Sequence, residues 1–124
     1  MKIQGQIEFT VVEQTPDQVV SKMPVTAGIK NPFGTVHAGA TLWFADVTAT
    51  MLVMGHGNAT EGMKGFPLAI SLNANLLGNQ ADGEFTATAR YVKRGRSVSV
   101  VRTTVEGRDG KLIADVTTSH VPAK

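Results

Sequence analysis

The chain has 124 residues, of which 42% are hydrophobic and 18% are charged. This length suits one hydrophobic core, so residues 1–124 are expected to form a single domain, and the composition argues against disorder. Twelve Lys and Arg side chains oppose ten Asp and Glu, and a net charge of +2 is too small for bulk nucleic-acid binding. The chain has no cysteine and three scattered histidines, so we expect no disulfide, no metal site and no bound cofactor.

The first regular segment is expected at residues 3–12, where apolar and polar residues alternate as in a half-buried strand. A signal peptide would show a continuous apolar run here instead, so a cytoplasmic protein is expected. Residues 19–25 form a second apolar segment interrupted by Pro24, which indicates either an edge strand or a short helix. Residues 27–39 contain three glycines and a proline and are expected to form a loop.

Residues 38–54 contain a single charge, that of Asp46, and are apolar on nearly every helical face. The pattern predicts a central helix enclosed by the rest of the fold. A membrane span is the alternative, but the segment is short and an aspartate near its middle costs several kcal/mol in lipid. We therefore expect no membrane association.

Beyond the helix, the chain is rich in Val, Thr and small residues, which is typical of strands. Four strands are expected, at residues 66–77, 84–94, 96–107 and 111–121. Their connections are a six-residue loop at 78–83, a tight turn at Arg94-Gly95 and a hairpin at Asp109-Gly110. The sequence thus predicts an α+β fold in which an antiparallel sheet of about five or six strands wraps around one long helix.

Asp46 is the first candidate functional residue, because a buried carboxylate must be paired, hydrogen-bonded or raised in pKa. Either the carboxylate takes part in catalysis, or it turns to the surface or accepts a hydrogen bond from a loop amide and only stabilises the fold. The first helical turn, at Ala38 and Gly39, leaves backbone N–H groups free to stabilise an oxyanion, although small residues there also permit close packing. Asp46 lies eight residues, or about 12 Å, beyond Ala38. We hypothesise an isologous dimer that brings one helix start to the Asp46 of the other chain.

The spacing N-x5-H-x-G-x6-D, at Asn31, His37, Gly39 and Asp46, resembles that of the PaaI-like group of hotdog-fold thioesterases. The resemblance covers residues from about 27 to 121. It implies a homodimer with joined sheets, assembly into a homotetramer, and hydrolysis of an aryl- or medium-chain acyl-CoA at the subunit interface. By resemblance, Asp46 is the nucleophile or general base, and the N–H of Ala38 holds the thioester oxygen. Asn31 and His37 would position the attacking water, the thioester carbonyl or the loop itself. Alternatively, His37 only caps the helix.

Two departures from the family pattern bear on catalysis. Ala38 stands where relatives usually carry the first Gly of H-G-G. Its methyl group narrows the access of a substrate to the oxyanion position, while its backbone N–H is retained. Ala69 stands where many relatives place a Ser or Thr that helps the acid or the water. Ser71, two residues later, is expected on the same strand face and is the substitute at the substrate site.

A basic turn combines Lys93, Arg94, Gly95, Arg96 and Ser97. The resemblance implies that it meets the phosphates of coenzyme A, whereas basic hairpin tips more often protect strand edges.

Other side chains have a structural and a functional reading. Trp43, Phe44, Met51 and Met54 line an acyl pocket or, more simply, fill the core. His56 and His120 have no chemical partner nearby in the sequence and are expected to be structural or surface residues.

The favoured function is therefore an acyl-CoA thioesterase without metal or cofactor. One alternative is a hotdog dehydratase, in which His37 and a carboxylate act as an acid/base pair. Another is a non-catalytic acyl-CoA sensor, which Ala69 supports.

Overall fold

The structure, a computed structural model, describes residues 1–56 and 61–124. These described residues form an α+β fold with two strands, one α-helix and four further strands in chain order. The elements are β1 (Thr10–Gln14), β2 (Gln18–Pro24), α1 (Ala38–Met54), β3 (Pro67–Leu76), β4 (Glu84–Lys93), β5 (Ser99–Glu106) and β6 (Leu112–Pro122), with short 3-10 helices at Ala27–Ile29 and Arg108–Gly110.

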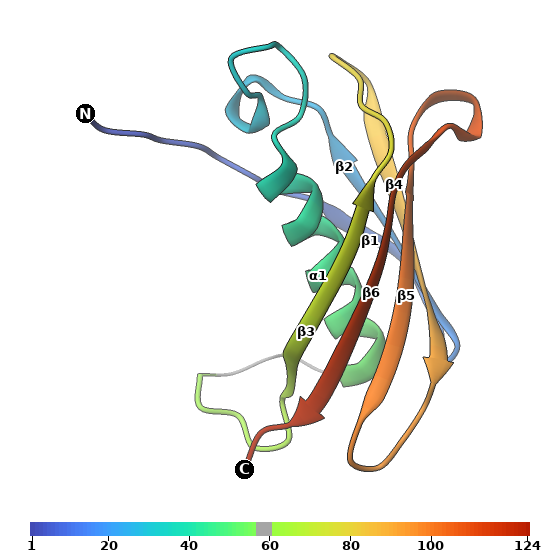
Figure 1. Ribbon diagram of the computed structural model, residues 1–124. Coiled ribbons are helices and arrows are strands. Elements are labelled where there is room, and N and C mark those ends of the chain that lie inside the picture. The colour runs from blue at the N-terminus through green and yellow to red at the C-terminus, as the bar shows by residue number, and fades with distance from the viewer. Residues whose placement is uncertain (57–60) are drawn as a thin grey trace.

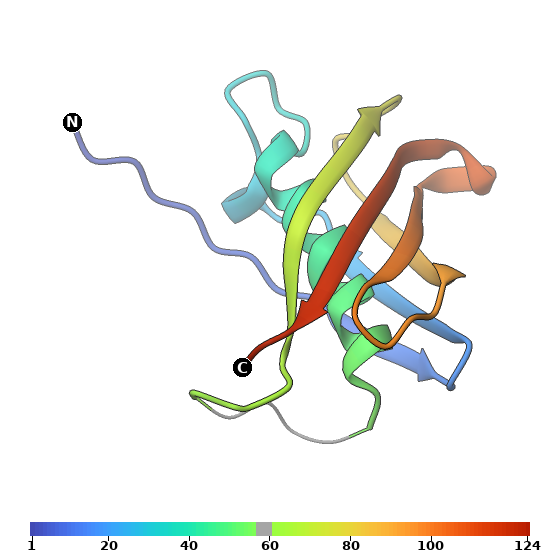
Figure 2. The same ribbon diagram turned by 60° about the horizontal axis from the view of Figure 1, so that its bottom comes forward.

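The six strands form one antiparallel sheet in the order β1-β2-β4-β5-β6-β3. The sheet curves around α1, which crosses its concave face (Figures 1 and 2). β3 follows the helix in the chain but lies beyond β6, at one edge of the sheet. The predicted helix, the four strands after it and the wrapped antiparallel sheet are confirmed.

α1 has clear boundaries. His37 precedes it in an extended conformation and accepts a hydrogen bond from the Ala40 N–H, and Gly55 ends it with φ +75°, a conformation that favours glycine. In the described part of the chain, no helix has the length and apolar content needed to cross a membrane.

The core lies between α1 and the concave face of the sheet. Phe44 and Ala45 share a fully buried cluster with Phe85 of β4, and Ala49 and Leu52 continue the helix contact toward β5. Phe9 packs edge-on against Phe44, with ring centroids 5.2 Å apart. The three- and four-residue spacing of the helix residues directs one helix face onto the sheet.

The N-terminal third differs from the prediction. Residues 3–9 are not a strand, because the chain there runs alongside the 26–28 loop, to which the Gln6 N–H donates a hydrogen bond at the Gly28 carbonyl, and not along a strand partner. Residues 18–24 are a strand between β1 and β4, so neither an edge strand nor a helix is correct. Pro24 is tolerated because it is the last residue of β2.

One side of the single chain stays open. The helix face turned away from the sheet is only half-buried. The sequence predicts an enclosed helix, but in the single chain α1 is covered on one side only. The neighbouring edge strand β3 exposes large apolar side chains: Leu68, Ile70, Leu72 and Leu76 are 42–60% exposed. An apolar edge strand of this kind is a site for pairing with another chain.

We expect Phe44→Ala to lower the free energy of unfolding by about 3–5 kcal/mol, because it removes a fully buried ring between helix and sheet. Val92→Ala on β4, where the side chain is 64% exposed, should change it by less than about 0.5 kcal/mol. Urea unfolding followed by circular dichroism measures both. Equal losses in the two variants would contradict this description of the core.

Candidate functional site

Asp46 lies near the middle of α1 and lines a cavity of about 270 Å³ between the helix and the start of β3. Apart from Asp46 and the Thr50 hydroxyl, the lining is apolar and comprises Val47, Met51, Met54, Phe66, Pro67, Leu68 and Ala69. A single acid in an apolar pocket is an arrangement found in enzyme active sites.

The Asp46 carboxyl is only partly accessible. Its Oδ1 atom is buried and has no hydrogen-bond partner in the part of the chain that the structure describes. Burial raises the pKa of Asp46, because desolvation disfavours the charged form, and the charge of His120 offsets part of this effect. No loop amide donates a hydrogen bond to Oδ1 in the described residues, so the alternative in which Asp46 is bonded by a loop amide has no support at this oxygen.

Of the four α1 side chains that the sequence analysis weighed as an acyl pocket, two belong to the cavity. Met51 and Met54 line it, whereas Phe44 is fully buried in the core and Trp43 packs beside it. The structure thus divides a set that the sequence left undecided between pocket and core.

The hydroxyl groups near Asp46 differ from the prediction. Ala69 lines the cavity as expected, but a β-bulge between Ala69 and Ser71 shifts the register with β6. Ala69 pairs with the buried His120, whereas Ser71 pairs with Ser119 on the outer face. Directly paired residues share a face, so the prediction that Ser71 lies on the same face as Ala69 is wrong.

Thr50 was missed by the sequence analysis. It follows Asp46 by one helical turn and lines the same cavity. Residues four apart lie on one helix face, so this spacing was the available signal.

The helix N-terminus presents the predicted amides. Nδ1 of His37 accepts a hydrogen bond of 3.0 Å from the Ala40 N–H, which confirms the capping reading of this residue. Ala38 and Gly39 are exposed, and no hydrogen bond to either amide is found within the described residues. A Cβ on Gly39 would come within 3.1 Å of the His37 ring. The small residue therefore lets the histidine fold back over the first turn.

Asn31 organises the loop before α1. Its Oδ1 accepts from the Thr35 N–H at 3.2 Å, and its Nδ2 donates to the Thr35 hydroxyl at 3.1 Å. The backbone of His37 is held in turn by a 2.9 Å bond to the Ile29 carbonyl. In this chain Asn31 contacts the loop and fixes the approach to the helix.

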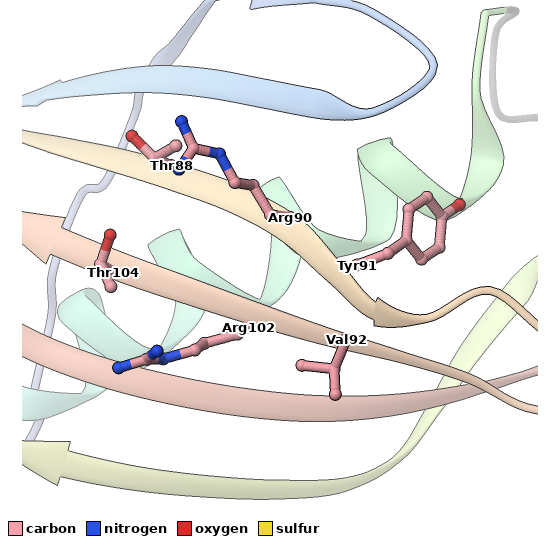
Figure 3. A pocket seen from close by; sticks show the side chains of 6 residues that line it. All are labelled: Thr88, Arg90, Tyr91, Val92, Arg102 and Thr104. Carbon is pink, nitrogen blue, oxygen red and sulfur yellow. The ribbon is translucent and has the colours of Figure 1, made fainter.

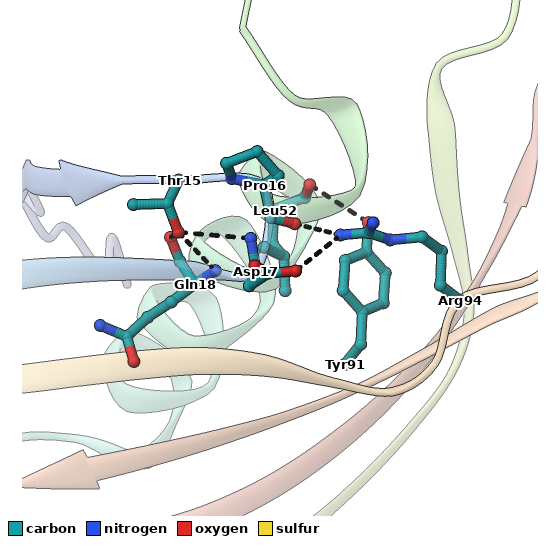
Figure 4. A network of polar contacts seen from close by, with 7 residues as sticks. All are labelled: Thr15, Pro16, Asp17, Gln18, Leu52, Tyr91 and Arg94. Atoms are coloured by element: carbon teal, nitrogen blue, oxygen red, sulfur yellow. Dashed lines mark hydrogen bonds and ion pairs between the residues drawn. The ribbon is translucent and has the colours of Figure 1, made fainter.

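The basic turn divides into two parts. Arg94 donates to the Pro16 carbonyl, lies 3.6 Å from an Asp17 carboxylate oxygen and stacks over Tyr91 at 4.4 Å (Figure 4). The Tyr91 hydroxyl donates to the Leu52 carbonyl, so this network ties the β1–β2 turn to the end of α1.

The second part of the turn, residues 95–97, lines a separate hollow. Gly95, Arg96 and Ser97 line a pocket of about 190 Å³ that also includes Ser99 and His120. Lys93 ends β4 and is exposed. His120 is buried and His56 is exposed, as expected for a structural and a surface residue.

A further hollow of about 310 Å³ lies on the outer face of the sheet and is lined by side chains that include Thr88, Arg90 and Arg102 (Figure 3). Its guanidinium groups have partners, because Arg102 donates to Asp115 at 2.6 Å and Arg90 to Gln18 at 2.7 Å. It lies across the sheet from Asp46. Among the described residues, no three His, Asp or Glu side chains gather as a metal site would require.

Comparison with known proteins decides the family. Residues 33–114 match the thioesterase superfamily. The chain belongs to this superfamily. A Pseudomonas aeruginosa protein named as an esterase, PA1618, is 30% identical over 108 residues, which cover 86% of this chain and 72% of that protein.

Two other similarities agree with this assignment. The crystal structure of a point mutant of the Staphylococcus aureus thioesterase SAV0944 superimposes with a TM-score of 0.84 and 28% identity, covering 94% of this chain and 93% of that one. The 1,4-dihydroxy-2-naphthoyl-CoA hydrolase of Listeria monocytogenes is 26% identical over 113 residues, 91% of this chain and 89% of that protein. The predicted hotdog fold and thioester hydrolase class are confirmed.

In this thioesterase we expect Asp46→Asn to unfold at a higher urea concentration than wild type at pH 7. The pKa of Asp46 is raised in the folded chain, so its charged form opposes folding above that pKa. Below about pH 3, where the acid is neutral in both states, the difference should vanish.

Asp115→Asn is the control with the opposite sign. The hydrogen bond from Arg102 lowers the pKa of Asp115, so this substitution should weaken the fold at pH 7. All proteins are compared at one concentration, because assembly shifts apparent stability. An Asp46→Asn protein with the same advantage at both pH values would contradict the assignment of burial as the cause.

Proposed function

We propose that the protein hydrolyses an acyl-CoA thioester with an aryl or medium-chain acyl group, in the cytoplasm and without metal or cofactor. The observation that carries the proposal is the Oδ1 of Asp46, which lies beside an apolar cavity and has no hydrogen-bond partner among the described residues. Such a cavity suits an apolar acyl group, and a partly desolvated carboxylate suits a base or nucleophile. Similarity to the Listeria hydrolase, which is named for a CoA thioester, supports this substrate class.

Asp46 acts in one of two ways. As a general base it takes a proton from the water that attacks the thioester carbonyl; as a nucleophile it attacks the carbonyl itself and forms an anhydride that water then cleaves. In both cases the sulfur leaves as the coenzyme A thiolate. Thr50, which lines the same cavity, supplies the hydroxyl that orients the water, since Ala69 has none. Asn31 and His37 act through the loop and the helix cap, not at the reacting atoms.

The oxyanion donors come from a second chain in this proposal. Ala38 and Asp46 are eight residues apart on one helix, or about 12 Å along its axis, which is too far for one carbonyl carbon to meet both. A homodimer that pairs the apolar β3 edges brings each Asp46 toward the Ala38 and Gly39 amides of the partner. Two such dimers form the proposed homotetramer.

Coenzyme A approaches past the basic turn. Arg96, with Gly95 and Ser97, lines a pocket that shares Pro67 with the Asp46 cavity, and Lys93 lies exposed beside it. Arg96 and Lys93 therefore meet the phosphates, while Arg94 holds the turn in place through its contacts with Pro16 and Asp17. Ser71 faces the other side of the sheet and has no part in this path.

The acyl-CoA sensor is the second candidate. Ala69 favours it, because β3 contributes no hydroxyl to the cavity. Thr50 in the same cavity favours hydrolysis, which is why we rank the sensor lower. The dehydratase ranks last, because Nδ1 of His37 is already engaged by the Ala40 N–H.

A thiol-release assay with a panel of aryl- and medium-chain CoA esters tests the proposed reaction. We expect wild type to release thiol, and Asp46→Asn to lower kcat by about 10²–10⁴-fold, because it removes the base without changing the cavity shape. Asp109→Asn, in the distant β5–β6 turn, is the control and should retain wild-type rates. If wild type binds CoA esters and releases no thiol from any, the protein is a sensor.

Ile70→Lys tests the role of the β3 edge. Ile70 is 60% exposed on this edge strand, and a charge there should block pairing, giving monomers in analytical ultracentrifugation and loss of most thiol release. Val92→Lys, at 64% exposure on the outer face of β4, is a β-branched control of similar exposure and should keep the assembly. A monomeric Ile70→Lys protein at full rate would show that no partner amides are needed.

A further inference from the structure

Asn79 joins two loops that are far apart in the sequence. It belongs to the loop between β3 and β4, which lies at the same end of the molecule as the loop before α1 (Figure 1). Its Oδ1 accepts a hydrogen bond of 3.1 Å from the Val36 N–H, and its Nδ2 donates to the Val36 carbonyl at 2.8 Å. One side-chain amide therefore binds both backbone polar groups of a single residue.

Val36 needs these bonds because of how its loop pairs with itself. Residues 29–31 and 35–37 form a short antiparallel ladder in which Val36 lies opposite Lys30. The hydrogen bonds of this ladder come from the flanking residues, so the N–H and C=O of Val36 point away from Lys30. Val36 is 1% exposed, and buried backbone groups need partners, which Asn79 supplies.

The neighbours of Asn79 in the chain are tied to the sheet. On one side, the Gly78 N–H donates to the Ile113 carbonyl of β6 at 3.1 Å. On the other side, the Gln80 side chain accepts from the Arg108 N–H at 3.2 Å and donates to the carbonyl of the first residue of β4 at 3.2 Å. Asn79 therefore holds the loop before α1 at a position that the sheet determines.

We propose that Asn79 is a positioning residue for the oxyanion amides: it fixes Val36 and thereby the direction in which α1 starts. The proposal rests on the proposed function, which places the thioester oxygen at the Ala38 and Gly39 N–H groups. Val36 directly precedes His37, the N-cap residue, and Ala38 is the first residue of the helix. A shift of the Val36 backbone therefore moves these amides relative to the reacting carbonyl, and a misplacement of about 1 Å can cost about 10²-fold in rate.

Asn31 acts on the same point from within the loop. Its Nδ2 donates to the Val36 carbonyl at 3.4 Å, a longer bond than the 2.8 Å bond from Asn79. Asn31 belongs to the loop that it organises, whereas Asn79 ties that loop to the sheet. Asn31 therefore sets the shape of the loop, and Asn79 sets where the loop lies.

The amide resonances of Ala38 and Gly39 in nitrogen-15 NMR spectra test the inference without substrate. Asn79→Ala removes both bonds to Val36, so we expect both resonances to shift from their wild-type positions. Asn79→Asp keeps the shape of the side chain and its acceptor but loses the donor, so it should shift the same resonances and serves if Asn79→Ala does not fold. Gln80→Ala is the matched control: it loosens the same loop, keeps the backbone bond to Asn79, and should leave both resonances in place.

Thiol release tests the consequence for catalysis. We expect Asn79→Ala to lower kcat by about 10–10²-fold, because displaced amides stabilise the oxyanion less. KM for the CoA ester should stay close to that of wild type, because the basic turn and the Asp46 cavity are unchanged, whereas a general loss of structure would alter both constants. Gln80→Ala should keep the wild-type kcat.

The two measurements separate this inference from the proposed function. If wild type releases no thiol, the proposed function fails, while the NMR spectra still decide whether Asn79 holds the start of α1. Unshifted Ala38 and Gly39 resonances in both Asn79 variants would overturn the inference. A wild-type kcat in Asn79→Ala, or an equal loss in Gln80→Ala, would overturn it as well.

Discussion

Holding a carboxylate beside an apolar cavity costs free energy, because the charged form is partly desolvated. The packing of the rest of the fold offsets this cost. Asp46 has a buried oxygen without a partner in the described residues, on a helix whose other face packs tightly against a sheet. On the helix face turned toward the sheet, Phe44 and Phe85 share a fully buried cluster, and burial of such apolar side chains stabilises the position of the helix against this cost. The helix therefore stays in place although its acid is partly desolvated.

Much of the fold was predictable because its signals are local. A nearly uncharged segment with a capping residue before it and Gly55 after it predicts α1 within a residue, and turn residues mark the later strands. The first strand was misplaced because Ile3 and Ile7 alternate with polar residues without having a strand partner. Alternation reports which face is apolar, whereas a strand also needs a neighbour whose backbone it can bond.

The site was predictable where it depends on one element and not where it depends on strand pairing. Asp46 stands out as the single charge in an apolar helix. Thr50, four residues later, carries a local signal that was available. Ser71 was placed on the wrong face because a bulge changes the register there.

The open edge of the sheet and the incomplete site have a common explanation in the proposed dimer. α1 is a continuous helix, so the distance of about 12 Å between its first amides and Asp46 cannot shorten within one chain. The wall of the Asp46 cavity includes Leu68 and Ala69, the same part of β3 that begins the exposed apolar edge. Covering that edge with a second copy would bury apolar surface at the mouth of the cavity. The free energy of assembly would then hold the partner's amides where the thioester oxygen needs them.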